Sequence, residues 1–111
     1  MNESILTSIK KLLGITEEYT HFDTDIIIHI NTVLMTLNQL GIGPVNGFNI
    51  KDETSRWDDY IKEDDDLEAV KTFIYLKVKI VFDPPVNSTV MEAYKQTIKE
   101  LEWRLNIQAE S

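Results

Sequence analysis

VKTFIYLKVKIVFDPP, residues Val70–Pro85, is the stretch that decides the fold. Apolar residues alternate with others over residues 74–82, and many are β-branched or aromatic, as in a strand. The same stretch also carries an apolar stripe with helical spacing. The acids Asp64–Asp66 suit a helix amino terminus, and Asp83-Pro84-Pro85 would end a helix sharply. Because of these flanks and the length of the segment, we predict a helix over residues 67–82.

Lys77 falls inside the apolar stripe of this predicted helix. A lysine in such a place extends its ammonium group to an edge, pairs with a carboxylate, or reaches a subunit boundary. In a strand the same lysine would simply be exposed. Lys77 is therefore both a test of the secondary structure and a candidate interface residue.

After the prolines, Asn87 or Ser88 can cap a last helix. Its apolar residues recur at intervals of three and four, as in a coiled-coil seam, and are Met91, Tyr94, Ile98, Leu101 and Leu105. Trp103 lies off this seam, on the face expected to be wet. It either packs on another element of the chain or anchors an interface, since Trp is enriched at binding hot spots. The neighbouring Arg104 is spaced to pair with Glu100.

Two more helices are expected before the central stretch. Residues 5–13 form a short amphipathic helix that Gly14 ends, and residues 23–40 form a longer helix with acids in its first turn. The longer helix is apolar around much of its circumference, with Ile28 and Met35 opposite its main stripe. It is either the central helix of a bundle or a helix with one stripe against a neighbouring subunit.

Between the helix over residues 23–40 and the helix over residues 67–82 lies a connection of about 20 residues, from Gly41 to about Glu63, against the roughly 2–8 that usually join helices in a bundle. Asn46-Gly47 suits a hairpin turn, and aromatic residues follow it. We predict one mainly α domain over residues 1–111. It is a small bundle of about four helices, with a long ordered loop or small β-hairpin inserted at residues 42–61 and a flexible tail at 107–111.

The chain is acidic, with 111 residues and a formal charge of −8. Nine acids against two basic residues between Asp52 and Glu68 account for most of that charge. Such a charge argues against a protein that grips DNA, because that affinity comes largely from Lys and Arg. No apolar run approaches the roughly 20 residues of a membrane span, and the amino terminus does not have the pattern of a signal peptide.

Chemical sites are hard to find in this sequence. Cysteine is absent, which excludes thiolate catalysis and Cys-ligated zinc. His21, Asp23, Asp25 and His29 could be metal ligands, but helix capping and an Asp–His pair explain them better. The acidic run before residue 67 lacks the glycine and glutamate that an EF-hand needs, and no phosphate loop or nucleophile elbow is present. We therefore expect no enzyme, no cofactor and no metal.

Several segments, taken in order, resemble the head-tail connector proteins of tailed bacteriophages and prophages, also called head-completion or adaptor proteins. These segments are Asp25–Val33, Gln39–Pro44, Val70–Pro85 and Glu100–Asn106. The resemblance extends over residues 10–106. None of the segments is a chemical motif, so the resemblance depends on their order along the chain.

The resemblance implies a helical protomer that assembles into a ring, commonly twelvefold, under the portal protein of a DNA-filled capsid. Such rings extend the DNA channel, let packaged DNA pass without specific binding, and receive the next neck or tail-completion protein. They belong to the virion neck and assemble in the bacterial cytoplasm, away from membranes. They have no catalytic residues.

The resemblance also suggests where contacts lie. The insertion would face the channel or an adjacent subunit, with candidates Phe48, Ile50, Asp52, Glu53, Trp57, Asp58 and Asp59. The carboxy-terminal helix would engage the portal. Candidates for a subunit or portal interface are Ile28, Met35, Lys77, Trp103 and Arg104.

The charge leaves two functions open. An acidic lining suits a conduit through which DNA must slide, because like charge removes phosphate-binding sites. An acidic helical regulator or DNA mimic that occupies a basic partner protein would show the same excess of acids.

Overall fold

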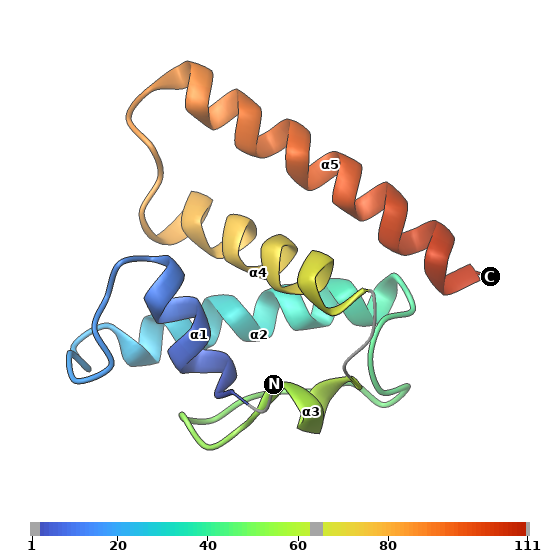
Figure 1. Ribbon diagram of the computed structural model, residues 1–111, viewed down its shortest axis with the longest axis horizontal. Coiled ribbons are helices and arrows are strands. Elements are labelled where there is room, and N and C mark those ends of the chain that lie inside the picture. Colours follow the sequence, from blue (N-terminus) through green and yellow to red (C-terminus); the bar gives the residue numbers. More distant parts are fainter. Residues whose placement is uncertain (1–2, 63–65, 111) are drawn as a thin grey trace.

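A computed structural model describes residues 3–62 and 66–110, and its helices are arranged as Figure 1 shows. The helices are α1 (Ile5–Leu12), α2 (Asp23–Gln39), α3 (Trp57–Tyr60), α4 (Leu67–Phe82) and α5 (Ser88–Glu110). No strand occurs in the described residues, where an isolated bridge joins Ser4 and Arg56. The predicted mainly α class is confirmed, and the helix beyond the expected four is the single turn α3.

α4 is the helix on which the fold is built, and the prediction of a helix for this stretch is confirmed. It packs against α1, α2 and α5, so it is covered on several sides. Its buried residues are Leu67, Val70, Phe73, Ile74, Leu76 and Val78. They include members of both the strand-like and the helix-like pattern, which explains why the sequence fitted both. The acids Asp64 and Asp65 lie outside the described residues.

α2 is covered mainly on one side, so it is not the central helix of the bundle. Its buried residues are Ile26, Ile30, Val33, Leu34 and Leu37. They face α4 and α1, whereas Ile28 and Met35 are exposed. The central helix of the bundle is therefore α4, which has three neighbouring helices, and not α2, as the apolar pattern of α2 had suggested.

α1 is held to α2 by a buried charge as well as by apolar packing. The Lys10 ammonium lies 2.8 Å from an Asp23 carboxylate oxygen and donates to the Glu17 carbonyl at 3.1 Å. Lys10 itself is buried. Since a buried charge is costly unless it is paired and hydrogen-bonded, this contact fixes how the loop between α1 and α2 closes. At the other end of α1, the Ser4 hydroxyl caps the helix by accepting from the Thr7 N–H at 3.2 Å.

α5 lies along α4 (Figure 1). The Asn87 side chain caps it, accepting from the N–H groups of Thr89 and Val90. Over residues 88–109, all but five residues are exposed, and these five are Met91, Tyr94, Ile98, Leu101 and Leu105. The predicted seam is therefore confirmed. α5 continues to Glu110 and so includes most of the segment for which we predicted a flexible tail.

The insertion at residues 42–61 is a loop of turns and bends with α3 near its end. Asn46-Gly47 forms a turn, in which the Gly47 N–H donates to the Pro44 carbonyl at 2.9 Å, but no hairpin strands flank it in this described segment. The side-chain amide of Asn31 both donates to the Ile50 carbonyl at 3.0 Å and accepts from the Ile50 N–H at 2.8 Å. This pair of bonds ties the middle of the insertion to α2.

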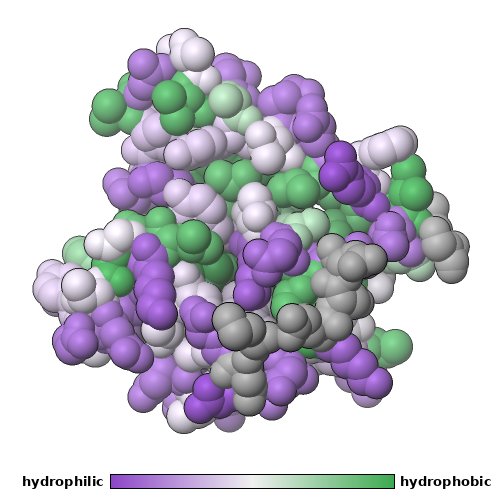
Figure 2. All heavy atoms as spheres, viewed as in Figure 1, coloured by the Kyte–Doolittle hydropathy of each residue, from purple (hydrophilic) through white to green (hydrophobic). Residues whose placement is uncertain are grey.

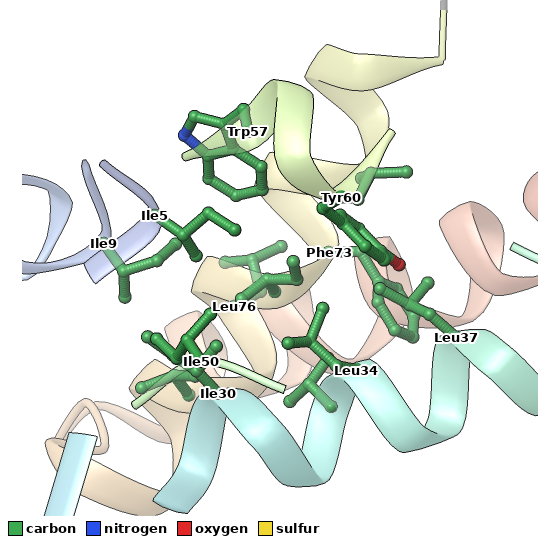
Figure 3. Close-up of a cluster of buried hydrophobic side chains, with 14 of the residues drawn as sticks. Ile5, Ile9, Ile30, Leu34, Leu37, Ile50, Trp57, Tyr60, Phe73 and Leu76 are labelled. Carbon is green, nitrogen blue, oxygen red and sulfur yellow. The ribbon is translucent and has the colours of Figure 1, made fainter. Parts of the chain in front are cut away.

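The end of the insertion is anchored in the core, where Trp57 and Tyr60 lie beside residues of α1 and α2 (Figure 3). The Trp57 indole N–H donates to the Ser8 hydroxyl at 2.9 Å. Backbone bonds continue the contact, from the Ile5 N–H to the Ser55 carbonyl and from the Trp57 N–H to the Glu3 carbonyl, both at 3.0 Å. The insertion is thus part of the protomer core and does not project freely.

Two glycines of the insertion provide a matched test of this anchoring. Gly43 and Gly47 both have φ near +90°, but a Cβ on Gly43 would lie 2.5 Å from the Tyr60 ring, whereas one on Gly47 would meet nothing. We expect Gly47→Ala to lower the free energy of unfolding by about 1–2 kcal/mol through backbone strain alone. Gly43→Ala should cost about 1–3 kcal/mol more, because Tyr60 must move. Urea denaturation measures both values, and equal losses would contradict the role of Tyr60.

Candidate assembly surfaces

A hollow of about 300 Å³ opens between α4 and α5, and we call it the α4–α5 groove. Its lining residues are Lys77, Ile80, Val81, Lys95, Ile98 and Lys99. The apolar members form its walls, and Val81 keeps 59% of its surface exposed. Figure 2 shows hydrophobic atoms along the gap between α5 and the rest of the molecule, with hydrophilic atoms on either side. In a chain with a charge of −8, a groove with three lysines is a distinct electropositive site.

Lys77 lines this groove and extends its ammonium group to the edge of the apolar surface, the first of the three possibilities considered from the sequence. It is half-buried, and its ammonium lies 5.8 Å from the centre of the Phe73 ring. The stem of the lysine covers apolar surface while the charge stays at the edge, over the electron-rich face of an aromatic ring. Lys77 is therefore accommodated within the protomer and also available at its edge.

The outer face of α5 carries a second hollow, of about 320 Å³. Its lining residues are Gln96, Lys99, Glu100, Trp103 and Arg104. Trp103 is 69% exposed, so the alternative in which it packs on its own chain is wrong. Lys99 lines both hollows, and the two surfaces are therefore continuous along α5. Trp103 and Arg104, each predicted for an interface, thus line one outward hollow.

The outer side of α2 is a third surface, which we call the α2 stripe. It consists of Asp25, Ile28, Thr32, Met35 and Gln39. All five are exposed, with Ile28 at 56% and Met35 at 63%. Large apolar side chains on an exposed helix face are typical of protein contact sites when they occur together. Both α2 residues predicted for an interface are thus on the protomer surface.

The insertion divides its predicted residues between core and surface. Ile50 and Trp57 are buried in the protomer, and Phe48 packs partly against the core. The prediction that Ile50 and Trp57 face a channel or a neighbouring subunit is therefore wrong, because aromatic and aliphatic anchors were needed to hold the insertion down. The exposed members are the acids Asp52, Glu53, Asp58 and Asp59, which we call the acidic edge.

Local hydrogen bonds fix part of the acidic edge. Asp52 accepts from the Thr54 hydroxyl and backbone N–H, and these bonds lower the pKa of the Asp52 carboxyl. Asp59 accepts from the Arg56 N–H at 2.9 Å, which stabilises the start of α3. Two of the four acids, Asp52 and Asp59, are thus fixed by local hydrogen bonds.

The sequence did not single out Lys95 and Lys99 as site residues. Their spacing of four places them on one helix face, and this spacing in an acidic chain was a usable signal. Ile80 and Val81 were harder to recognise as site residues from the sequence. They line the groove because α5 does not cover this part of α4, and the sequence pattern does not show the path of α5.

The residues considered for a metal are not assembled into a site. Asp23 pairs with Lys10, and the His21 ring packs edge-on against Phe22. Among the described residues, no group of three or more His, Cys, Asp or Glu side chains is placed to hold a metal ion. Within the same residues, no helix is long and apolar enough to cross a membrane.

The chain is small and mainly helical, and the described residues present three exposed surfaces of the kind that suits protein contacts. A family model described as phage connector protein matches residues 5–111. This chain therefore belongs to the phage connector protein family, and it is a structural component of the virion that connects phage parts. No curated protein and no solved structure matches it. The family membership favours the connector interpretation over an acidic regulator or DNA mimic.

Trp103 and Leu105 lie two residues apart on α5 and allow a surface position to be compared with a core position. Leu105 is buried and Trp103 is exposed. We expect Leu105→Ala to lower the free energy of unfolding by about 2–5 kcal/mol, because it leaves a cavity against α4. Trp103→Ala should change it by less than about 0.5 kcal/mol. Urea denaturation of both variants gives the comparison, and a large loss with Trp103→Ala would mean that the indole stabilises the protomer.

Proposed function

We propose that this connector forms a homo-oligomeric ring under the portal protein, extends the DNA channel and joins the capsid to the tail. The observation that supports this most is the presence of large exposed apolar residues on two separate helices, α2 and α5. Exposed apolar surface of this kind is stabilised when other protein covers it. Two separate surfaces suit a subunit with more than one neighbour, as every subunit of a ring has.

The acidic edge supports the channel part of the proposal. Its four acids are exposed on one segment, and the chain carries a charge of −8. A wall of like charge offers DNA phosphates no cationic partners, so DNA moves past it with little retention. In the proposed ring the acidic edge lines or borders the channel. The three lysines of the α4–α5 groove are then turned away from the DNA and toward protein.

The outer face of α5 is the surface that we assign to the portal or to the next neck protein. It combines an exposed indole, a guanidinium and a mixture of charges in one hollow. Trp and Arg are the residues that most often dominate binding energy at protein interfaces. α5 is also free to make this contact, since it packs on the protomer along its other side.

Ring formation is tested by measuring the mass of the protein over a range of concentrations, followed by negative-stain microscopy with and without its portal protein. We expect closed rings, either of the free protein at high concentration or on the portal. A chain that stays monomeric in both conditions would overturn the proposal.

The assignment of the outer face of α5 is tested with Trp103→Ala and a control, Gln108→Ala, which changes an exposed residue outside the hollow. We expect Trp103→Ala to weaken docking to the portal or neck protein by about tenfold or more, as a hot-spot truncation does. Gln108→Ala should leave docking unchanged. Binding is measured by surface plasmon resonance, and equal binding by both variants would exclude Trp103 from the contact.

The channel assignment is tested by neutralising the acidic edge with Asp52→Asn, Glu53→Gln, Asp58→Asn and Asp59→Asn together. The control neutralises four exposed acids elsewhere, namely Glu17, Glu18, Glu92 and Glu102. We expect the first variant to retain DNA in assembled rings with a steeper salt dependence, while the control behaves like the parent. Equal retention of DNA by rings of both variants would show that the total charge of the chain, and not the position of the acidic edge, determines how DNA passes. Tight, salt-sensitive DNA binding by parent rings would contradict a sliding channel.

A further inference from the structure

We propose that the α2 stripe of one copy packs into the α4–α5 groove of the next copy, so that subunits join head to tail. This inference rests on the proposed ring and specifies which surfaces form its subunit contact. The partner that the groove takes is thus a helix face of a second copy of this chain.

The groove has the form that an amphipathic helix face requires. Its walls are aliphatic, from Ile80 and Val81 on α4 and Ile98 on α5. Lysines border these walls on both helices. An apolar centre with a charged border is the usual composition of a protein interface. The exposed Val81 shows that no element within residues 3–62 and 66–110 fills the groove on this side.

The α2 stripe has the matching form. Its residues recur at intervals of three and four, so that Ile28 and Met35 stand two turns apart on one line, with Thr32 between them. At about 100° per residue, this line lies on the opposite side of α2 from the buried residues of the helix. The short Thr32 side chain leaves a shallow gap between two large apolar ones. A row of this shape fits into a groove better than it fits against a flat surface.

The charges of the two surfaces also match. α2 contains Asp23 and Asp25 and no Lys or Arg, and Asp25 belongs to the stripe. The groove presents Lys77, Lys95 and Lys99. The stripe, with one carboxylate and no base, and the groove, with three lysines, therefore have charges of opposite sign. Charge complementarity of this kind selects partner and register.

The position of the two surfaces decides the symmetry of the contact. α4 packs against α2 and against α5, and Figure 1 shows it lying between them. The stripe points away from α4, so it lies on the far side of the protomer from the groove. Two copies cannot satisfy both surfaces reciprocally, as a two-fold dimer would require. Each copy instead offers its groove to one neighbour and its stripe to another, which gives a closed ring or an open helix.

Engineered cysteines test this contact directly, because the chain has no cysteine of its own. Met35→Cys and Val81→Cys are made separately, mixed and oxidised, both as free protein at high concentration and on portal rings. We expect several-fold more disulfide-linked dimer in the mixture than in either variant alone. A protein with both substitutions should give a ladder of linked species. The control mixes Val81→Cys with Glu18→Cys, an exposed position outside the stripe, and should give only background dimer.

The outcomes separate this inference from the proposed function. Preferential linkage of Met35→Cys to Val81→Cys supports the head-to-tail contact. Preferential linkage of either variant to itself would overturn it in favour of a two-fold contact. Rings that form without the predicted linkage would overturn this inference and leave the proposed ring standing. Background linkage together with a monomer under all conditions, portal included, would overturn both.

Discussion

The structure depends on covering α4, a helix that is apolar on most of its circumference. One neighbour cannot bury such a helix, so α2, α1 and α5 each cover a part of it. Full burial of a large aliphatic or aromatic side chain contributes about 1.5–3 kcal/mol. The many buried residues of α4 thus outweigh any local preference for a strand, and the other helices take their places around it.

Polar contacts then determine how the shorter pieces join this core. The Asn31 amide satisfies both backbone groups of Ile50, and the Trp57 indole satisfies its donor on Ser8. Unsatisfied buried polar groups are costly, so these bonds favour one position of the insertion over others. The ion pair of the buried Lys10 with the half-buried Asp23 does the same for the first loop. The surfaces available for assembly are what remains once these contacts are made.

Much of the fold followed from sequence pattern, and much of the candidate site did not. Helical spacing predicted the α5 seam. The same geometry placed Trp103 off that seam and Ile28 and Met35 opposite the main stripe of α2, but it left open whether the same chain covers them, and the structure shows them exposed. The insertion was harder, because Ile50 and Trp57 are core residues supplied by a loop, and apolar loop residues look alike whether they anchor the loop or meet a partner. The α4–α5 groove arises from how two helices diverge, which no local pattern encodes.

The single seam of α5 has a consequence for the order of events in virion assembly. A helix attached along one edge opens independently of the rest of the molecule more readily than a helix buried on several sides. In the proposed assembly, partner protein on the outer face of α5 would slow that opening, so an incorporated subunit would be more rigid than a free one. Exchange of subunits would then be fast before incorporation and slow afterwards, which gives assembly a direction without any chemical reaction.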